Sequence, residues 1–403
     1  MSHCLILKNT GIKDMKRRNF IKTGSILTVA ATVPSIAFSD RISEDHQMKI
    51  DSKKINFTRD GLDFTPAEYS NLLSKLSANA GISIDDYSLG GVVEELEKGM
   101  AKILGTESAI FMPTGTLANH IAVRKLAGEN RKVLVQSDSH LYRDSGDCAN
   151  ILSGLNLIPL GKGKVDFNLA EVEKEYLRTN EGRVDTQIGV ISIESPVRRY
   201  NNQLFDFDKM KEISAFAHKN NIKMHLDGAR LFNACVHTDK SPNDFVELFD
   251  TVYISLYKNF NAASGAILAG KKTFIEDLFH TRRMFGGGVI QVWPFAAVAN
   301  HYLDSFLSDY EASLKQADVF FNELQAQSDI DIFKIPNGSN VFQMNLNHID
   351  ATRLIVALEA MNVFLPAVNH NDGFIYFKIN PSILRKPVNE LTRIFIQAIK
   401  EVS

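Results

Sequence analysis

The middle of the chain reads His-Leu-Asp-Gly-Ala-Arg-Leu-Phe-Asn-Ala at residues 225–234. The apolar run 223–226 in front of Asp227 is typical of a buried strand, so this carboxylate stands at the strand's C-terminal end, where α/β sheets build their sites. A carboxylate there can pair with a protonated pyridine nitrogen and keep that ring electron-withdrawing. Taken alone, Asp227 could also be a helix N-cap, and Arg230 part of a surface ion pair.

Similar apolar runs stand on both sides of this stretch and alternate with amphipathic helical segments. They cover residues 109–112, 132–136, 155–160, 188–194, 251–256 and 266–269. Several are nearly continuous in apolar residues, as buried parallel strands are. The alternation predicts an α/β protein whose mostly parallel central sheet is covered by helices on both faces.

A different pattern follows from Trp293 onward. Two long helical stretches lead to short strands at 341–344 and 374–378 and to a final helix. This order predicts a smaller α+β C-terminal domain. We therefore place a large domain at residues 57–292 and a small domain at residues 293–403.

The N-terminus differs from the rest of the chain in composition. The basic run 16–22 contains Arg17-Arg18 and is followed by the weakly apolar stretch 23–38, which is too short to span a bilayer. This pattern resembles a twin-arginine export signal, although a basic amphipathic helix is the alternative. We predict a signal peptide over residues 1–39, a polar linker over residues 40–56 and a periplasmic mature protein.

Composition and charge argue against several classes of protein. The 403 residues are 44% hydrophobic and 23% charged, with a net charge of −2 and no basic stripe of the kind that binds nucleic acid. Cys4, Cys148 and Cys235 provide neither a disulfide framework nor a CxxC pair, so we expect no metal site. No apolar run of membrane-spanning length follows the signal, so we expect no membrane partner once the signal is removed.

A second motif, Pro113-Thr114-Gly115-Thr116, follows a predicted strand and precedes a predicted helix. The first turn of a helix offers free backbone N–H groups and a positive dipole end, which bind phosphate. Gly115 lets a phosphate approach the backbone, while Thr114 and Thr116 add hydroxyl groups. An ordinary threonine N-cap is the alternative.

A third motif places Lys258 directly after the strand-like run 251–256. It follows Asp227 by about one βαβ pass, so the two residues could stand on nearby strand ends. A partly buried lysine has a lowered pKa and becomes a nucleophile toward an aldehyde. A solvated lysine is the alternative for this motif alone.

Together with Ser139-His140 and the string Arg-Met-Phe-Gly-Gly-Gly at 283–288, these motifs resemble the threonine aldolase/β-eliminating lyase family. The resemblance covers about residues 56–400, and the segments 85–87 and 94–97 also follow the family's pattern. It implies the aspartate aminotransferase-like fold, pyridoxal 5′-phosphate (PLP) as cofactor and an amino acid as substrate. It further implies a homodimer or homotetramer, with the loop 286–288 near the subunit interface.

The resemblance also implies a role for each motif residue. Lys258 is expected to be the Schiff-base lysine, and Asp227 the partner of the pyridine nitrogen. The turn Thr114–Thr116 is expected to hold the phosphate. His140 is expected to stack on the ring, and Arg230 to lie near the ring hydroxyl or the substrate carboxylate.

Two positions depart from the family's pattern near the substrate. Val197 replaces a histidine associated with the substrate's β-hydroxyl, and valine cannot transfer a proton. Tyr376 stands where an arginine usually binds the substrate carboxylate, so Lys378 or Arg59 could act in its place. Val197, Pro196 and Tyr376 would make the pocket more apolar, so we expect β-hydroxy amino acids with larger or apolar side chains to react better than threonine.

Three functions remain open from the sequence. The first is retro-aldol cleavage of a β-hydroxy amino acid to glycine and an aldehyde, as in a low-specificity threonine aldolase. The second is another PLP reaction: β-elimination, racemisation or transamination. The third is a non-catalytic exported PLP-binding protein, but Lys258, Asp227 and Arg230 together argue against it, because a binder needs no electron sink.

Overall fold

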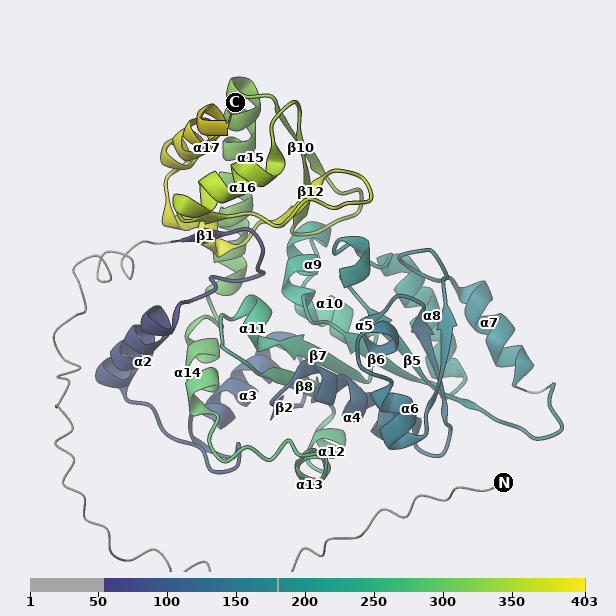
Figure 1. Ribbon diagram of the computed structural model, residues 1–403. Coiled ribbons are helices and arrows are strands. Elements are labelled where there is room, and N and C mark those ends of the chain that lie inside the picture. Colours follow the sequence, from purple (N-terminus) through teal and green to yellow (C-terminus); the bar gives the residue numbers. More distant parts are fainter. Residues whose placement is uncertain (1–53, 180, 403) are drawn as a thin grey trace, which may run out of the picture. The chain divides into compact units, whose positions relative to one another are not determined.

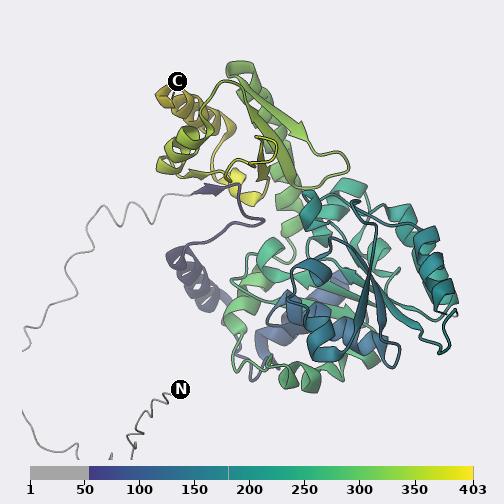
Figure 2. The same cartoon turned by 45° about the vertical axis from the view of Figure 1, so that its right-hand side comes forward.

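The computed structural model describes residues 54–179 and 181–402 (Figures 1 and 2). The predicted signal peptide, and the predicted linker up to residue 53, lie outside these residues. Within them, no helix combines the length and the apolar character needed to cross a membrane.

A seven-stranded sheet forms the centre of the large domain. In spatial order its strands are β2 (Ser108–Met112), β8 (Ala266–Gly270), β7 (Thr251–Ser255), β6 (Lys223–Asp227), β5 (Ile188–Glu194), β3 (Lys132–Gln136) and β4 (Asn156–Leu160). The strands from β7 to β4 pair in parallel, whereas β8 runs antiparallel to both of its neighbours. All seven predicted apolar runs therefore form strands, and the predicted α/β architecture with a mostly parallel sheet is confirmed.

Helices cover this sheet (Figure 1). They are α3 (Gly91–Leu104), α4 (Gly115–Ala127), α5 (His140–Arg143), α6 (Cys148–Ser153), α7 (Leu169–Arg178), α8 (Phe207–Lys219), α9 (Leu231–Thr238), α10 (Pro242–Val246), α11 (Leu256–Asn259), α12 (Lys272–Ile275), α13 (Leu278–Met284) and α14 (Trp293–His301). Along β3, Leu134 packs into the main core, whereas Val133 and Val135 pack on the other face with Val123 of α4. Burial of both faces explains the nearly unbroken apolar sequences of the strands.

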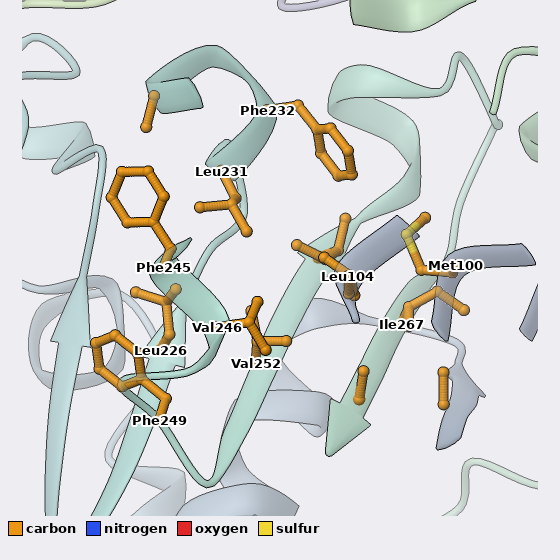
Figure 3. Packing of buried hydrophobic residues seen from close by; sticks show 14 of the residues in the cluster. Met100, Leu104, Leu226, Leu231, Phe232, Phe245, Val246, Phe249, Val252 and Ile267 are labelled. Carbon is orange, nitrogen blue, oxygen red and sulfur yellow. The ribbon is translucent and has the colours of Figure 1, made fainter. Parts of the chain in front are cut away.

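The main core joins the sheet to the helices on one of these faces. Figure 3 shows Met100 and Leu104 of α3 near Ile267 of β8, and Leu226 and Val252 of the neighbouring strands nearby. Side chains of α9 and α10 complete this part of the core. The strand ends that carry the predicted site residues therefore stand on a tightly packed base.

The small domain contains an antiparallel three-stranded sheet. Its spatial order is β12 (Ile375–Lys378), β10 (Val341–Leu346) and β9 (Ile330–Lys334), and its helices are α15 (Phe306–Gln327), α16 (Ala351–Ala360) and α17 (Val388–Val402). The predicted strands and final helix are present, whereas β9 and α16 carried no prediction. Strand β9 has one buried residue, so its sequence lacks an apolar run.

The start of the described chain belongs to the small domain's core. Strand β1 (Ile55–Asn56) pairs in parallel with β11 (Val363–Phe364), and Ile55 and Phe57 are fully buried in that core. The prediction of a polar linker is wrong for residues 55–56, and the predicted start of the large domain at residue 57 is wrong as well. From here the chain passes Asp60 and enters α2 (Pro66–Ala80), so it runs between the two domains.

Candidate active site

A cavity of about 230 Å³ lies where β5, β6 and β7 end. Its wall consists of Pro113, Thr114, Gly115, Thr116, His140, Glu194, Arg198, Asp227, Ala229, Arg230, Tyr253, Tyr257, Lys258, Ser264 and Gly265. All the residues predicted to be catalytic or to bind the cofactor are in this set. The carboxyl ends of parallel strands meet at one edge of a sheet, which explains why motifs far apart in sequence converge here.

Asp227 ends β6 and is held at both carboxylate oxygens. Oδ2 accepts a hydrogen bond of 2.6 Å from Asn119 Nδ2, and Oδ1 accepts one of 3.2 Å from the backbone N–H of Ala229. The side chain is 4% exposed. A fixed, buried carboxylate of this kind can keep a proton on a pyridine nitrogen.

A chain of buried hydrogen bonds through Asn119, His225 and Thr251 orients the carboxylate of Asp227. Because Asn119 donates to Asp227, its Oδ1 must accept from His225 Nε2, at 2.9 Å. His225 Nδ1 then accepts from the Thr251 hydroxyl, also at 2.9 Å. Burial lowers the pKa of His225 to about 4, so this imidazole is neutral and keeps one tautomer.

Lys258 follows β7 in the short helix α11 and is 9% exposed. Burial, and next the positive charge of Arg230, lower the pKa of Lys258 to about 8. A larger fraction of the amine is therefore unprotonated at neutral pH than in an exposed lysine, which suits attack on an aldehyde. Its Nζ lies 5.3 Å from the centre of the Tyr257 ring.

The turn before α4 forms the third wall of the cavity. Thr114 is the N-cap, and its hydroxyl accepts a hydrogen bond of 3.2 Å from the backbone N–H of Leu117. A Cβ added at Gly115 would lie 2.0 Å from the hydroxyl oxygen of Tyr253, so no larger residue fits there. Burial raises the pKa of Tyr253, which keeps its hydroxyl protonated as a hydrogen-bond donor.

These groups fit the functional parts of PLP. The helix N-terminus at Gly115, with the neighbouring hydroxyl groups, suits a phosphate. Asp227 suits a pyridinium nitrogen, and the amine of Lys258 suits an aldehyde.

His140, which the family resemblance places on the ring face, begins α5 and lines the cavity. The Ser145 hydroxyl donates to the carbonyl of His140 at 3.0 Å, so its oxygen accepts from His140 Nδ1 at 3.2 Å. This arrangement places the ring proton on Nδ1 and leaves the lone pair on Nε2. Burial lowers the pKa of His140, so the neutral ring can accept a proton near pH 7.

Glu194 is a site residue that the sequence prediction missed. It ends β5 beside Asp227 and accepts hydrogen bonds from the backbone N–H groups of His140 and Arg198, the latter at 2.9 Å. Burial, and next the charge of Asp227, raise the pKa of Glu194 to about 7. A carboxylate ending an otherwise apolar strand was the signal that could have identified it.

Asp60 is a second site residue that the sequence prediction missed, and its carboxylate forms an ion pair with Arg230. Arg230 donates through Nε and Nη2 to the two carboxylate oxygens of Asp60, both at 2.9 Å, and Lys378 Nζ donates to Oδ2 at 3.1 Å. Burial alone would raise the pKa of Asp60, but the charges of Arg230 and Lys378 hold it far below its usual value. The local sequence gives no signal for this contact, because Asp60 and Arg230 are 170 residues apart.

A larger cavity of about 980 Å³ adjoins the first one. The two share His140, Arg198, Arg230, Tyr257 and Lys258, so the larger cavity opens directly onto the predicted cofactor site. We call it the outer chamber. Its volume can accommodate an amino acid substrate.

The outer chamber brings together some of the predicted substrate residues but not others. Lys378 and Arg59 line it, whereas Tyr376 donates to Asp372 Oδ2 at 2.8 Å and lines neither cavity in the described part of the chain. Val197 and Pro196 are buried and likewise lie outside both walls. The expected apolar pocket is therefore wrong at these positions. Val197 and Pro196 are buried inside the protein, the hydroxyl of the partly exposed Tyr376 binds Asp372, and charged side chains form much of the chamber's wall.

The fold and this set of groups define a PLP-dependent lyase of the aspartate aminotransferase-like class. The model of the beta-eliminating lyase family matches residues 73–375, and the chain belongs to that family.

Named relatives and a solved structure agree with this assignment. The low-specificity L-threonine aldolase of Candida albicans is 29% identical over 269 residues, which are 64% of this chain and 70% of that protein. The low-specificity L-threonine aldolase of Saccharomyces cerevisiae is 28% identical over 246 residues, which are 60% of this chain and 62% of that protein. A structure from Listeria monocytogenes, described as a candidate L-allo-threonine aldolase, has a TM-score of 0.67 and 25% identity, covering 83% of this chain and 93% of that one.

Proposed function

We propose that this protein cleaves the Cα–Cβ bond of a β-hydroxy amino acid, releasing glycine and an aldehyde. The observation that carries the proposal is the position of neutral His140, which lines both the cavity containing Lys258 and Asp227 and the outer chamber. A base at this junction can reach a substrate hydroxyl while the rest of the substrate occupies the chamber. The threonine aldolases among the relatives support the same reaction.

Bound PLP would supply an electron-withdrawing ring that accepts the electron pair of the broken bond. Asp227 would hold a proton on the ring nitrogen, and His140 Nε2 would accept the proton of the β-hydroxyl. The β-carbon then leaves as an aldehyde, and Cα takes up a proton to become that of glycine. Because Val197 lies outside both cavities, His140 replaces the missing family histidine as the base.

The test is aldehyde release from threonine, allo-threonine and phenylserine by the purified holoprotein. His140→Ala should lower kcat/KM by about 10²–10⁴-fold, the usual cost of losing a positioned general base. His218→Ala is a matched control, because His218 is half-exposed and lines neither of the two cavities described above. Full activity of His140→Ala would contradict the assigned base.

A second candidate is PLP chemistry at Cα without loss of the aldehyde: β-elimination, racemisation or transamination. The replacement of the family's histidine by Val197 favours it, because these reactions do not need a base at the β-hydroxyl. A 2-oxo acid and ammonia in place of an aldehyde, 2-oxobutyrate from threonine or phenylpyruvate from phenylserine, would identify elimination. A change in optical rotation without new products would identify racemisation.

We also propose that the subunits form a homodimer or homotetramer. The exposed apolar residues Ile84, Leu89, Met284, Val289 and Ile290 support this, because they stand on two segments joined by backbone and side-chain hydrogen bonds. Exposed apolar groups of this kind mark association surfaces. Analytical ultracentrifugation at working concentration tests it, and an active monomer would contradict it.

Export to the periplasm is proposed from the sequence around Arg17-Arg18, which lies outside the described residues. A variant with both arginines replaced by lysine should remain in the cytosol. Normal export of that variant would contradict the twin-arginine route.

A further inference from the structure

The outer chamber carries an excess of positive charge. Besides Lys258, the Schiff-base candidate, its wall contains four cationic side chains, Arg59, Arg198, Arg230 and Lys378, and three carboxylates, Asp60, Asp63 and Asp144. Each of these carboxylates lies between two cations, Asp63 between Lys54 and Arg59. The groups around Asp60 and Asp144 are the ones that reach the cofactor site, and they stand at different places in the chamber wall. The distribution of their charges indicates what the chamber binds.

The first group, which we call the Asp60 cluster, consists of Asp60, Arg230 and Lys378. Arg230 holds Asp60 in a bidentate pair, which is the geometry that satisfies a carboxylate most completely. Lys378 adds a third hydrogen bond and a second positive charge. The cluster therefore has a net charge of about +1, carried at Lys378 on strand β12 of the small domain.

The second group, which we call the Asp144 cluster, consists of Asp144, Arg198 and Arg199. Arg199 holds both oxygens of Asp144, through Nη2 and through Nε at 3.1 Å, whereas Arg198 donates to Asp144 through Nη2 alone. Arg199 thus neutralises the carboxylate, and Arg198 carries the surplus charge. Arg198 lines both cavities, and its backbone N–H binds Glu194 at the cofactor site.

From this arrangement we infer that the substrate is a β-hydroxy amino acid with a second carboxylate on its side chain, for which 3-hydroxyaspartate is the smallest example. Lys378, beside Arg230, binds the α-carboxylate, and Arg198 binds the carboxylate of the side chain. Arg198 directly follows Val197, the position of the family's histidine, and unlike Val197 it lines both cavities. The inference rests on the proposed retro-aldol function and names its substrate class.

The reaction on such a substrate balances without a further reactant. The Cα–Cβ bond breaks, the β-hydroxyl loses its proton, and the β-carbon becomes the aldehyde carbon of glyoxylate. The electron pair remains on Cα, which takes a proton to give glycine. Glyoxylate keeps its carboxylate, so Arg198 would face the same charge in substrate and product.

The first experiment compares kcat/KM of the holoenzyme for 3-hydroxyaspartate, threonine and phenylserine. Wild type should prefer 3-hydroxyaspartate, and Arg198→Gln should lower kcat/KM for it by about tenfold or more, as expected for a lost hydrogen bond to a charged group. The values for threonine and phenylserine should change much less. An equal loss on all three substrates would overturn the inference, because it would mean that Arg198 supports only the structure.

Arg199→Gln is an independent second variant, since Arg199 lines neither cavity in the described part of the chain. Without Arg199, Asp144 would neutralise Arg198, so the same substrate-selective loss is expected. Arg178→Gln is the matched control, because Arg178 is an exposed arginine paired with Glu175 on α7. No selective loss in Arg199→Gln would contradict the charge balance described here.

Binding of succinate and butyrate to the holoenzyme, measured by calorimetry, separates this inference from the proposed reaction. Neither acid has an amine or a β-hydroxyl, so neither can react. Succinate should bind more tightly than butyrate to wild type, and Arg198→Gln should remove that difference. If succinate binds more tightly but no amino acid releases an aldehyde, the two-carboxylate site is retained and the retro-aldol function is rejected. If both acids bind equally, the two-carboxylate site itself is rejected.

Discussion

The Asp60 cluster and the Asp144 cluster have the same composition, one carboxylate between two cations, but they differ in burial. In the first, the side chains of Asp60 and Arg230 are 9% and 4% exposed. In the second, those of Arg198 and Arg199 are 47% and 39% exposed. Asp144 itself is 16% exposed, so the second cluster differs mainly in that both of its arginines reach water.

This difference decides what each cluster can do. Charges interact strongly in a buried site and cannot be separated there without a large cost, so the Asp60 cluster fixes the position of Arg230 and ties the segment after β1 to both domains. Water and ions screen the exposed cluster, so its contacts with Arg198 can be exchanged for contacts with a ligand at little cost. The buried cluster orders the site, and the exposed one is free to respond to the substrate.

The largest effect is expected from breaking the buried cluster. Asp60→Asn removes the carboxylate but leaves Arg230 and Lys378 in place, so positive charge becomes uncompensated in the interior. The free energy of unfolding should fall by about 3–5 kcal/mol, as when one partner of a buried ion pair is removed. Urea denaturation of the purified protein measures this change.

The matched control for stability is Asp144→Asn, which makes the same change in the exposed cluster. A similar loss in both variants would show that burial does not distinguish the clusters. A loss below about 1 kcal/mol in Asp60→Asn would show that the buried pair is already solvated in the native protein.

The sequence was sufficient for the architecture of the large domain. Strands β3 and β5 begin and end at the predicted residues, because buried parallel strands have nearly continuous apolar sequences and polar residues where they emerge. The motif residues converged for the same reason: each stands at a strand end or a helix start. Strand β9 was missed because it has one buried residue and leaves no apolar run.

The parts of the site that the sequence did not reveal depend on contacts between distant segments. Asp60 reaches Arg230 because Ile55 and Phe57 anchor its segment in the small domain, and no local pattern encodes that path. Conversely, Val197 was taken as a pocket residue from its place in a family pattern, but its side chain is fully buried. A position in sequence identifies the neighbourhood of a site, whereas the direction of the side chain is set by the packing around it.

A second prediction uses Asp60 to test the electrostatics of Lys258. The main cause of the lowered pKa of Lys258 is burial, followed by the charge of Arg230, while Asp227 and Asp60 act in the opposite direction. Removing the charge of Asp60 should therefore lower the pKa of Lys258 further below about 8. The pH dependence of the rate at which the apoprotein takes up PLP reports this pKa, and its midpoint should move to lower pH in Asp60→Asn.

The same measurement on Asp144→Asn sharpens the comparison. The Asp144 cluster is partly exposed, and Asp144 is not among the main causes of the shifted pKa of Lys258. The midpoint should therefore stay at its wild-type value. Equal shifts in both variants would indicate a general change in the folded protein rather than the specific influence of Asp60.

The smallest effect on stability is expected from Asp144→Asn, where the free energy of unfolding should change by less than about 1 kcal/mol. Its effect on the substrate should nevertheless be measurable, because the variant leaves Arg198 without a competing carboxylate. With Arg198 released, KM for 3-hydroxyaspartate should fall, and KM for phenylserine should not, since phenylserine has no second carboxylate. Added salt should reduce this difference, because water and ions reach the exposed cluster. Equal KM changes for both substrates, or a higher KM for 3-hydroxyaspartate, would mean that Asp144 holds Arg198 in the position that binds the substrate. The exposed cluster would then order the site in the same way as the buried one.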